Sequence, residues 1–201
     1  MKEKLRKKYS ELREGIPPSI RRVAGEAAAA KLMNHPLVKN SRGVMVYISA
    51  GNEVPTDILI RRLLSSGHRV YIPVMEDGLI RPVRLTDPAE LKPGAFGIGE
   101  VPPEERVYAD LEEADIIITP GLCFSADGSR LGRGGGHYDR FLEKSPAYKI
   151  GLCYSFQLAG DIPQRGHDVR VDEVVAVIDG PSGSGEEDIC LTRSYMPQPG
   201  S

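Results

Sequence analysis

The sequence lacks the marks of a membrane protein, a secreted protein or a nucleic-acid-binding protein. Its longest apolar runs, such as residues 116–118, are far too short to cross a bilayer, and its charged first ten residues hold no apolar signal-peptide core. Lysine and arginine (26) nearly balance aspartate and glutamate (28), giving a net charge of −2. That balance favours neither a nucleic acid nor a membrane as partner. We therefore expect a cytoplasmic protein without such partners.

Cysteine is scarce and shows no metal or disulfide pattern. Cys123, Cys153 and Cys190 are odd in number, lie far apart and form neither a CxxC pair nor a zinc-binding spacing. This favours free thiols in a reducing compartment. A nucleophilic thiol needs a partner base. His137 is the only candidate near Cys123 in the sequence, which leaves that pair as an alternative the pattern does not require.

Apolar spacing along the chain predicts alternating helices and strands. Leu5, Tyr9, Leu12 and Ile16 fall on one face of a first helix, a second helix begins near Ser19, and a third follows the potential cap Thr56. The predicted strands span 43–49, 69–74, 79–85, 115–119, 149–155 and 173–178. Pro82 favours an edge position for the strand that contains it. The pattern predicts an α/β fold with a three-layer, Rossmann-like open sheet, mostly parallel and with helices on both faces.

One domain accounts for most of the length. Residues 1–179 are predicted to form a single α/β catalytic domain, in which residues 86–113, rich in proline, glycine and acid, are an excursion. Residues 180–201 begin with the linker-like run GPSGSGEE and are predicted to be a flexible C-terminal tail.

The run RLGRGGGHYD at residues 130–139 is the most informative segment. Glycines let backbone N–H groups approach an anion closely, and arginine donates charge-assisted bonds to phosphate oxygens. The closing Asp139 is suited to hold the Mg²⁺ that accompanies a nucleotide. The run is neither a Walker A motif nor G-x-G-x-x-G, because His137 stands where the third glycine belongs. Glycines alone would suit a flexible turn, but the two arginines and the aspartate favour a phosphate-binding loop.

Other charged residues have both a functional and an ordinary interpretation. Asp172 is either a second metal-facing carboxylate or a solvated residue before a strand. Glu53 lies in a polar turn after an apolar strand, where most glutamates are simply exposed. Lys2 and Arg6, one helical turn apart, form either a solvated basic face or part of a triphosphate site.

Taken together, these segments resemble a known family. Residues 120–124 (PGLCF) and 127–142 (DGSRLGRGGGHYDRFL) resemble the signature of 5-formyltetrahydrofolate cyclo-ligase, also called methenyltetrahydrofolate synthetase. Lys2 with Leu5 and Arg6 is similar to the basic N-terminal helix of that family. The turn holding Glu53 is similar to its substrate turn, and residues 171–174 (VDEV) are similar to its late acidic motif.

The resemblance implies an ATP- and Mg²⁺-dependent ligase that closes 5-formyltetrahydrofolate to 5,10-methenyltetrahydrofolate and releases ADP and phosphate. The formyl oxygen is phosphorylated, the neighbouring N10 then attacks the formyl carbon and phosphate leaves, so catalysis is mostly positioning and charge neutralisation. ATP is the co-substrate and Mg²⁺ the cofactor. A reduced folate is the other partner, and we expect a monomer or a weak homodimer.

The resemblance also assigns residues. It implies ATP contacts by Lys2, Arg6, Arg130, Gly132, Arg133, Gly134, Gly135, Gly136, His137 and Tyr138. The catalytic residues would be Arg130, Arg133 and Tyr138. Asp139 and Asp172 would hold Mg²⁺, and Ile48, Glu53 and His137 would contact the folate.

Two positions depart from the family pattern. The family commonly has Tyr-Tyr-Asp where this chain has His137, Tyr138 and Asp139, and some members carry lysine where this chain has Gly135. Two alternatives therefore stay open. One is a divergent paralogue that uses ATP on another formyl or amide substrate, and the other is a non-catalytic protein that binds folate or nucleotide.

Overall fold

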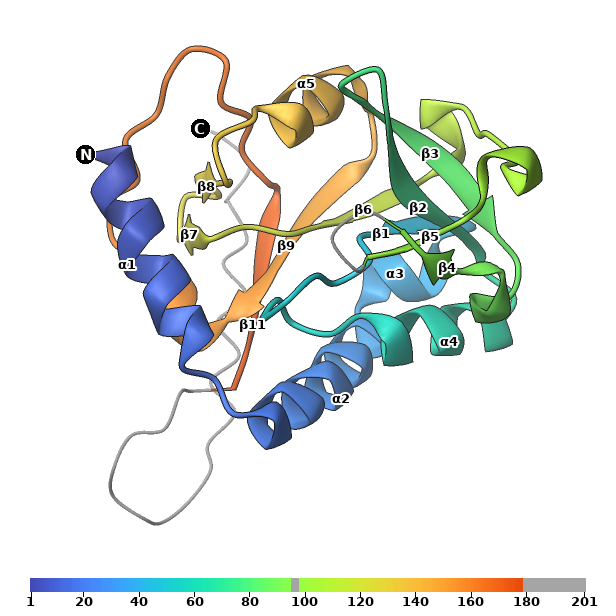
Figure 1. Ribbon diagram of the computed structural model, residues 1–201, viewed down its shortest axis with the longest axis horizontal. Coiled ribbons are helices and arrows are strands. Elements are labelled where there is room, and N and C mark those ends of the chain that lie inside the picture. Colours follow the sequence, from blue (N-terminus) through green and yellow to red (C-terminus); the bar gives the residue numbers. More distant parts are fainter. Residues whose placement is uncertain (95–97, 179–201) are drawn as a thin grey trace.

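A six-stranded sheet forms the centre of the molecule. The computed structural model describes residues 1–94 and 98–178 and shows the strand order β11-β9-β6-β1-β2-β3 (Figure 1). Its strands are β1 (Gly43–Val46), β2 (Arg69–Glu76), β3 (Leu79–Leu85), β6 (Ile116–Thr119), β9 (Tyr148–Tyr154) and β11 (Glu173–Val177). Neighbouring strands are parallel except for β3, which pairs antiparallel with β2 at one edge. The predicted mostly parallel α/β sheet is confirmed, as is the edge position of the strand with Pro82.

Strand β1 is shorter than its apolar pattern predicted. The prediction ran to residue 49, but the strand ends at Val46. Tyr47 leaves the ladder because its hydroxyl donates to the Val54 carbonyl at 2.8 Å, while its own carbonyl accepts from the Thr56 hydroxyl at 2.7 Å. These contacts hold the segment after β1, residues 47–56, as a wall beside the carboxyl edge of the sheet.

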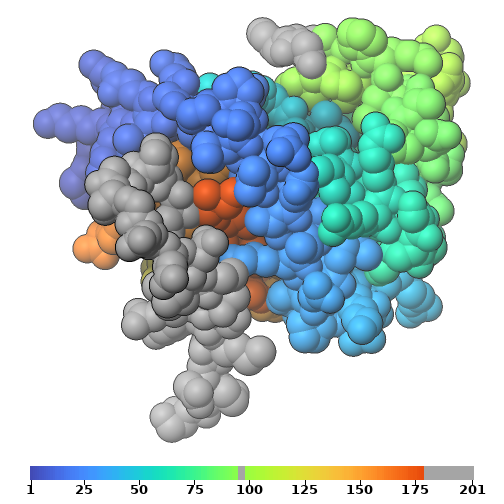
Figure 2. Space-filling model, turned by 90° about the horizontal axis from the view of Figure 1, so that it is seen from below, coloured from blue at the N-terminus to red at the C-terminus, as the bar shows by residue number. Residues whose placement is uncertain are grey.

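Three helices cover one face of the sheet, namely α2 (Pro18–Asn34), α3 (Pro36–Asn40) and α4 (Asp57–Ser65). They pack on alternate strand residues such as Val44, Ile72 and Ile118, because side chains of a strand alternate between the two faces. Seen from this side, the blue and cyan surface of the first third of the chain covers most of the face (Figure 2). Thr56 was predicted to cap α4, but its side chain does not do so because its hydroxyl donates to the Tyr47 carbonyl instead.

The other face carries α5 (His137–Lys144). Phe141 and Leu142 of this helix pack on the intervening strand residues Met45, Tyr71 and Ile117. Helices thus lie on both faces, as predicted.

A small second sheet links the first helix, α1 (Lys2–Glu14), to the main sheet. Its strands are β7 (Cys123–Ser125), β8 (Arg130–Leu131) and β10 (Leu158–Ala159), in the order β10-β7-β8. Tyr9 packs here with Leu122 and Leu131, and Leu5 packs partly buried against the same cluster. The predicted apolar face of α1 is only partly right, because Leu12 is 45% exposed while Arg13 is buried in its place.

Residues 86–94 and 98–113 contribute none of the six strands of the main sheet, although Tyr108 forms an isolated antiparallel bridge to Val83 of β3. They include the antiparallel pair β4 (Lys92–Pro93) and β5 (Gly99–Glu100). Among the described residues, the short 3₁₀ helices are η1 (Pro88–Glu90), η3 (Pro103–Glu105), η4 (Leu111–Glu113) and η5 (Ser155–Gln157). The tail predicted for 180–201 lies outside the described residues. Within the described ranges, no helix is long and apolar enough to span a membrane.

Phe124 of β7 packs directly on the backbone of Gly151 in β9. A Cβ added at Gly151 would lie 2.4 Å from the fully buried Phe124 ring. We expect Gly151→Ala to lower the free energy of unfolding by about 1–3 kcal/mol through overpacking. Urea denaturation measures this change. Gly160→Ala is the matched control, because nothing lies within 4 Å of its added Cβ. Equal stabilities of the two variants would contradict this account.

Candidate active site

A cleft of about 460 Å³ opens where the parallel strands end. Residues after the carboxyl ends of β1 and β6 line it, together with the last part of β2 and the segment from β8 to the start of α5. Ligands of open α/β sheets bind at this edge. Six cationic side chains line the cleft against four acidic ones, namely Lys2, Arg6, Arg13, Arg130, Arg133 and Arg165 against Glu53, Glu100, Asp139 and Asp168. The excess of positive charge suits an anionic ligand.

A tight hairpin delivers Arg130 to the cleft. Between β7 and β8, the Asp127 carboxylate accepts bonds from the Ser125 hydroxyl and from the amide and hydroxyl of Ser129. The Ser125 bond holds the pKa of Asp127 below its usual range. Gly128, with φ of +82°, completes the turn, and a Cβ there would clash with the Val171 carbonyl oxygen at 2.2 Å. The start of the predicted phosphate loop is therefore fixed.

Arg130 and Asp139, predicted to bind ATP and metal respectively, form a buried ion pair. Arg130 Nη2 donates to Asp139 Oδ1 at 2.9 Å, and the Arg130 side chain is only 3% exposed, against 16% for Asp139. The guanidinium also lies over the Tyr138 ring, 5.5 Å from its centroid. Burial raises the pKa of the Tyr138 hydroxyl well above its usual range, so this side chain is neutral at physiological pH. The Arg130–Asp139 pair therefore links the two ends of the glycine loop.

The glycine loop presents its backbone to the cleft. Gly132, Gly134, Gly135 and Gly136 all line it, and Gly134 and Gly136 have φ of +112° and +65°. Gly136 directly precedes α5, whose first N–H groups have no partner within the helix. The unpaired N–H groups and the dipole at such a helix start favour the binding of an anion.

The His137 ring occupies the space that a side chain at residue 135 would need. His137 Nδ1 lies 3.0 Å from the Gly78 carbonyl oxygen and 3.0 Å from the Arg140 guanidinium. In this orientation its ring would stand 2.6 Å from a Cβ at Gly135. The two departures from the family pattern are thus physically coupled.

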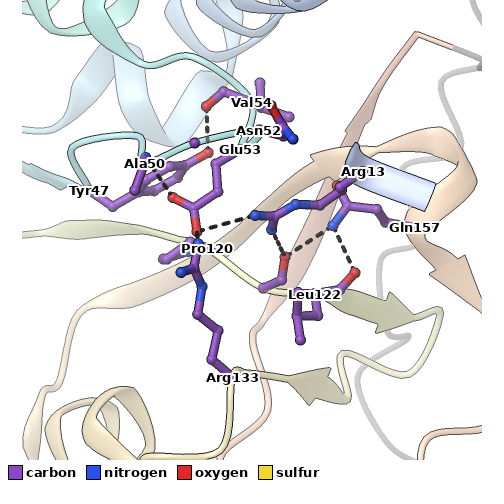
Figure 3. Close-up of polar contacts among 12 residues, drawn as sticks. Arg13, Tyr47, Ala50, Asn52, Glu53, Val54, Pro120, Leu122, Arg133 and Gln157 are labelled. Carbon is purple, nitrogen blue, oxygen red and sulfur yellow. Dashed lines mark hydrogen bonds and ion pairs between the residues drawn. The ribbon is translucent and has the colours of Figure 1, made fainter. Parts of the chain in front are cut away.

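Glu53 faces the loop from the opposite wall (Figure 3). Its Oε2 accepts from the Ala50 amide at 3.0 Å, and its Oε1 lies 3.1 Å from Arg133 and 3.8 Å from Arg13. The carboxylate is 11% exposed, whereas Arg133 is 65% exposed. Ile48 lines the same cleft. The structure therefore brings both predicted folate-contacting residues of this wall together.

Helix α1 contributes the two basic residues predicted from the N-terminus. Arg6 Nε donates to the Gly132 carbonyl at 3.1 Å. Lys2 forms a largely buried ion pair with Asp168, which also accepts from the Arg165 amide. Both cations line the cleft.

Asp172 is not brought into the cleft. It directly precedes β11, and its Oδ2 accepts from the Lys149 amide at 2.7 Å. Asp168 lines the cleft instead, and the amide of the next residue, Val169, donates to Asp139 at 3.3 Å. The expected grouping of Asp139 with Asp172 receives no support from this arrangement. No group of three or more potential metal-ligating side chains occurs among residues 1–94 and 98–178.

Sequence reasoning missed several residues of the cleft, including three that carry charge close to the proposed site residues. Arg13, Arg165 and Asp168 line it but were not predicted. A signal for Arg13 existed, because residues 2, 6 and 13 share one face of a helix. Arg165 and Asp168 belong to a segment without regular structure, where no periodicity reveals orientation.

The fold and the cleft define an α/β protein with a candidate anion-binding site at the carboxyl edge of a mostly parallel sheet. The model of the 5-formyltetrahydrofolate cyclo-ligase family matches residues 1–177. The chain belongs to this family. Its relatives include the 5-formyltetrahydrofolate cyclo-ligase of Escherichia coli K12, 32% identical over 169 residues that cover 81% of this chain and 93% of the relative.

Two further comparisons agree with this membership. The 5-formyltetrahydrofolate cyclo-ligase of Mycolicibacterium smegmatis is 33% identical over 181 residues, covering 87% of this chain and 92% of the relative. The NMR structure of Aquifex aeolicus 5,10-methenyltetrahydrofolate synthetase superposes with a TM-score of 0.77 at 32% identity, covering 96% of this chain and 98% of that one.

The two described cysteines are unsuited to nucleophilic chemistry. Burial raises the pKa of the Cys123 thiol to about 12, and it raises the pKa of Cys153 still further. Because the thiolate is the reactive form, iodoacetamide at pH 8 should leave both unmodified in the folded protein and modify both in urea. Mass spectrometry of the peptides measures this. Rapid labelling of Cys123 in the folded protein would revive the Cys123–His137 alternative.

Proposed function

We propose that this protein uses ATP to cyclise 5-formyltetrahydrofolate to 5,10-methenyltetrahydrofolate, releasing ADP and phosphate. One observation carries the proposal beyond family membership. A glycine-rich, arginine-flanked anion site and a fixed carboxylate, Glu53, face each other across a single cleft. A phosphate donor and a ring system with N–H donors would meet between them.

The chemistry needs positioning more than a protein nucleophile. The formyl group is an amide, so its carbon is a weak electrophile and its oxygen a poor leaving group. Transfer of the γ-phosphoryl group to that oxygen breaks the bond to ADP and creates a good leaving group. N10 then attacks the formyl carbon, loses its proton, and phosphate departs with the oxygen. Holding the reactants together and neutralising phosphate charge supply most of the rate enhancement of such reactions.

The basic side of the cleft is proposed to hold ATP. Arg6 and the loop Gly132–Gly136 would receive phosphate oxygens, with Lys2 close by and the start of α5 adding its free amides. Arg133, exposed and on this loop, is free to turn toward the γ-phosphate, where a guanidinium stabilises the transferring group. Arg130 is fixed by Asp139, so it would act as a stationary charge beneath the site.

The opposite wall is proposed to hold the folate. The Glu53 carboxylate can accept bonds from ring N–H groups of the pterin, and Ile48 offers an apolar surface beside it. His137 lies between the loop and the β2–β3 turn, within reach of the same space.

The residues present fit a magnesium ion delivered with ATP. Mg²⁺ commonly takes one or two carboxylates together with substrate phosphates. Asp139 Oδ1 is occupied by Arg130 and Val169, while its Oδ2 has no hydrogen-bond partner among the described residues. When bound, Mg²⁺ would neutralise phosphate charge. We propose Asp139 as its protein ligand. A cytoplasmic location and a monomeric or weakly dimeric state remain predictions.

The decisive assay is direct. Pure protein incubated with 5-formyltetrahydrofolate, ATP and Mg²⁺ should produce the absorbance of the methenyl product and one ADP per product. Omitting ATP should abolish the signal. ATP hydrolysis without folate turnover would favour a divergent paralogue with another formyl or amide substrate. Tight folate binding without phosphate release would favour a non-catalytic binding protein.

Substitutions on the ATP side should separate binding from turnover. Arg133→Ala should raise the KM for ATP by roughly tenfold or more, because it removes a charge-assisted contact to phosphate. Since the Arg133 side chain is exposed, the substitution should change stability little. Asp139→Asn should instead lower kcat at saturating ATP by at least about tenfold, because it weakens both the proposed metal site and the ion pair with Arg130 that holds the loop. Glu26→Gln, in an exposed pair with Arg22, is the control. An unchanged kcat in Asp139→Asn would refute the metal assignment.

A further inference from the structure

We propose that Arg13 is a positioning residue that holds the Glu53 carboxylate in place for the folate. The inference rests on the proposed function, because it assigns Arg13 to the folate half of that site. Nothing in the apolar spacing of α1 requires an arginine at this position.

Arg13 is a buried cation on a largely exposed helix. Its side chain is 7% exposed, and Tyr9 is the only other buried residue of α1. Burying a guanidinium is costly unless a counter-charge and hydrogen-bond acceptors compensate for the lost water. A hydrophobic residue at position 13 would pack α1 without this desolvation penalty, so we infer that the charge of Arg13 serves a function.

The counter-charge of Arg13 is Glu53. Arg13 Nη2 lies 3.8 Å from Glu53 Oε1, and no other acidic side chain in the described part of the chain lies within ion-pair distance of this guanidinium. Burial lowers the pKa of Arg13, and the Glu53 charge acts in the opposite direction. Among the described residues, the pair of Arg13 and Glu53 is the only ion pair that joins α1 to the segment following β1.

The other contact of Arg13 is rigidly held. Nη1 donates to the Gly121 carbonyl at 3.4 Å, and the same carbonyl accepts from the buried Gln157 side chain at 3.0 Å (Figure 3). Gln157 is fixed in turn by the Tyr154 amide at 3.0 Å. The guanidinium is thus anchored to the chain between β6 and β7, and its position does not depend on a ligand.

Arg13 is incompletely satisfied for a residue that serves stability alone. Its Nε is buried and has no hydrogen-bond partner among the described residues. An unsatisfied buried donor costs stability. A side chain that keeps this cost while facing a cleft carboxylate is better explained by a role in the site.

Arg133 cannot perform the same task during the reaction. It also contacts Glu53, at 3.1 Å, but it is exposed and belongs to the proposed ATP loop. Once Arg133 turns to phosphate, Glu53 keeps a neighbouring positive charge only through Arg13. The two arginines therefore have different roles: Arg133 contacts ATP, and Arg13 orients Glu53 for the folate.

The test is a double-mutant cycle in steady-state kinetics. Arg13→Gln should raise the KM for 5-formyltetrahydrofolate at least about tenfold and change the KM for ATP less than about twofold. Glu53→Gln should also raise the folate KM. In the Glu53→Gln background, adding Arg13→Gln should change it less than about twofold, because the effect acts through Glu53.

Two variants guard the interpretation. Arg22→Gln, on the exposed face of α2, should leave both KM values at wild-type levels. Arg13→Lys keeps the charge and should restore part of the folate affinity. If Arg13→Gln does not fold, as judged by its thermal unfolding, the cycle is measured with Arg13→Lys, whose smaller rise in the folate KM should likewise disappear in the Glu53→Gln background.

The outcomes distinguish this inference from the proposed function. Wild-type protein that makes no methenyl product refutes the function itself. Normal wild-type turnover combined with an unchanged folate KM in Arg13→Gln refutes only the role of Arg13. Additive effects of the Arg13 and Glu53 substitutions, or an equal rise in the ATP KM, would likewise overturn it by showing that Arg13 acts elsewhere.

Discussion

The ion pair of Arg130 and Asp139 fixes the geometry on which the rest of the cleft depends. It joins β8 to the first turn of α5, so the intervening loop of glycines is tied at both ends. Because both charges are largely buried, losing one partner would leave the other uncompensated, a far greater cost than losing an exposed pair. A loop with little side-chain packing of its own therefore keeps a defined backbone, which a site made of main-chain amides requires.

The fold followed from local patterns, whereas the site followed from them only in part. Strands such as β6 and helices such as α2 follow from runs and spacing of apolar residues, which local physics controls. The glycine loop could be recognised because its residue types are chemically unusual. The burial of Arg13 and the outward placement of Asp172 depend on contacts between distant segments, Gly121 in one case and Lys149 in the other. Periodicity places Arg13 on the same helix face as Lys2 and Arg6, but it does not encode these contacts with distant segments.

The coupled departures at residues 135 and 137 illustrate the same point. In the sequence they are two separate differences from the family pattern. In the structure, the imidazole of His137 is anchored to the Gly78 carbonyl and occupies the space that a side chain at residue 135 would need. Glycine at 135 is thus the condition for this orientation of His137. The anchoring also joins the β2–β3 turn to the start of α5, which closes one side of the cleft.

The contact between Arg133 and Glu53 has a thermodynamic consequence for ligand binding. It spans the two halves of the cleft, so each half partly neutralises the other when no ligand is present. Under the proposed function, the substrate that binds first would separate these charges, and the second would find its own partner already released. Linkage would make such assistance mutual, so each substrate would strengthen the binding of the other. A single surface-exposed arginine would then make two binding events interdependent.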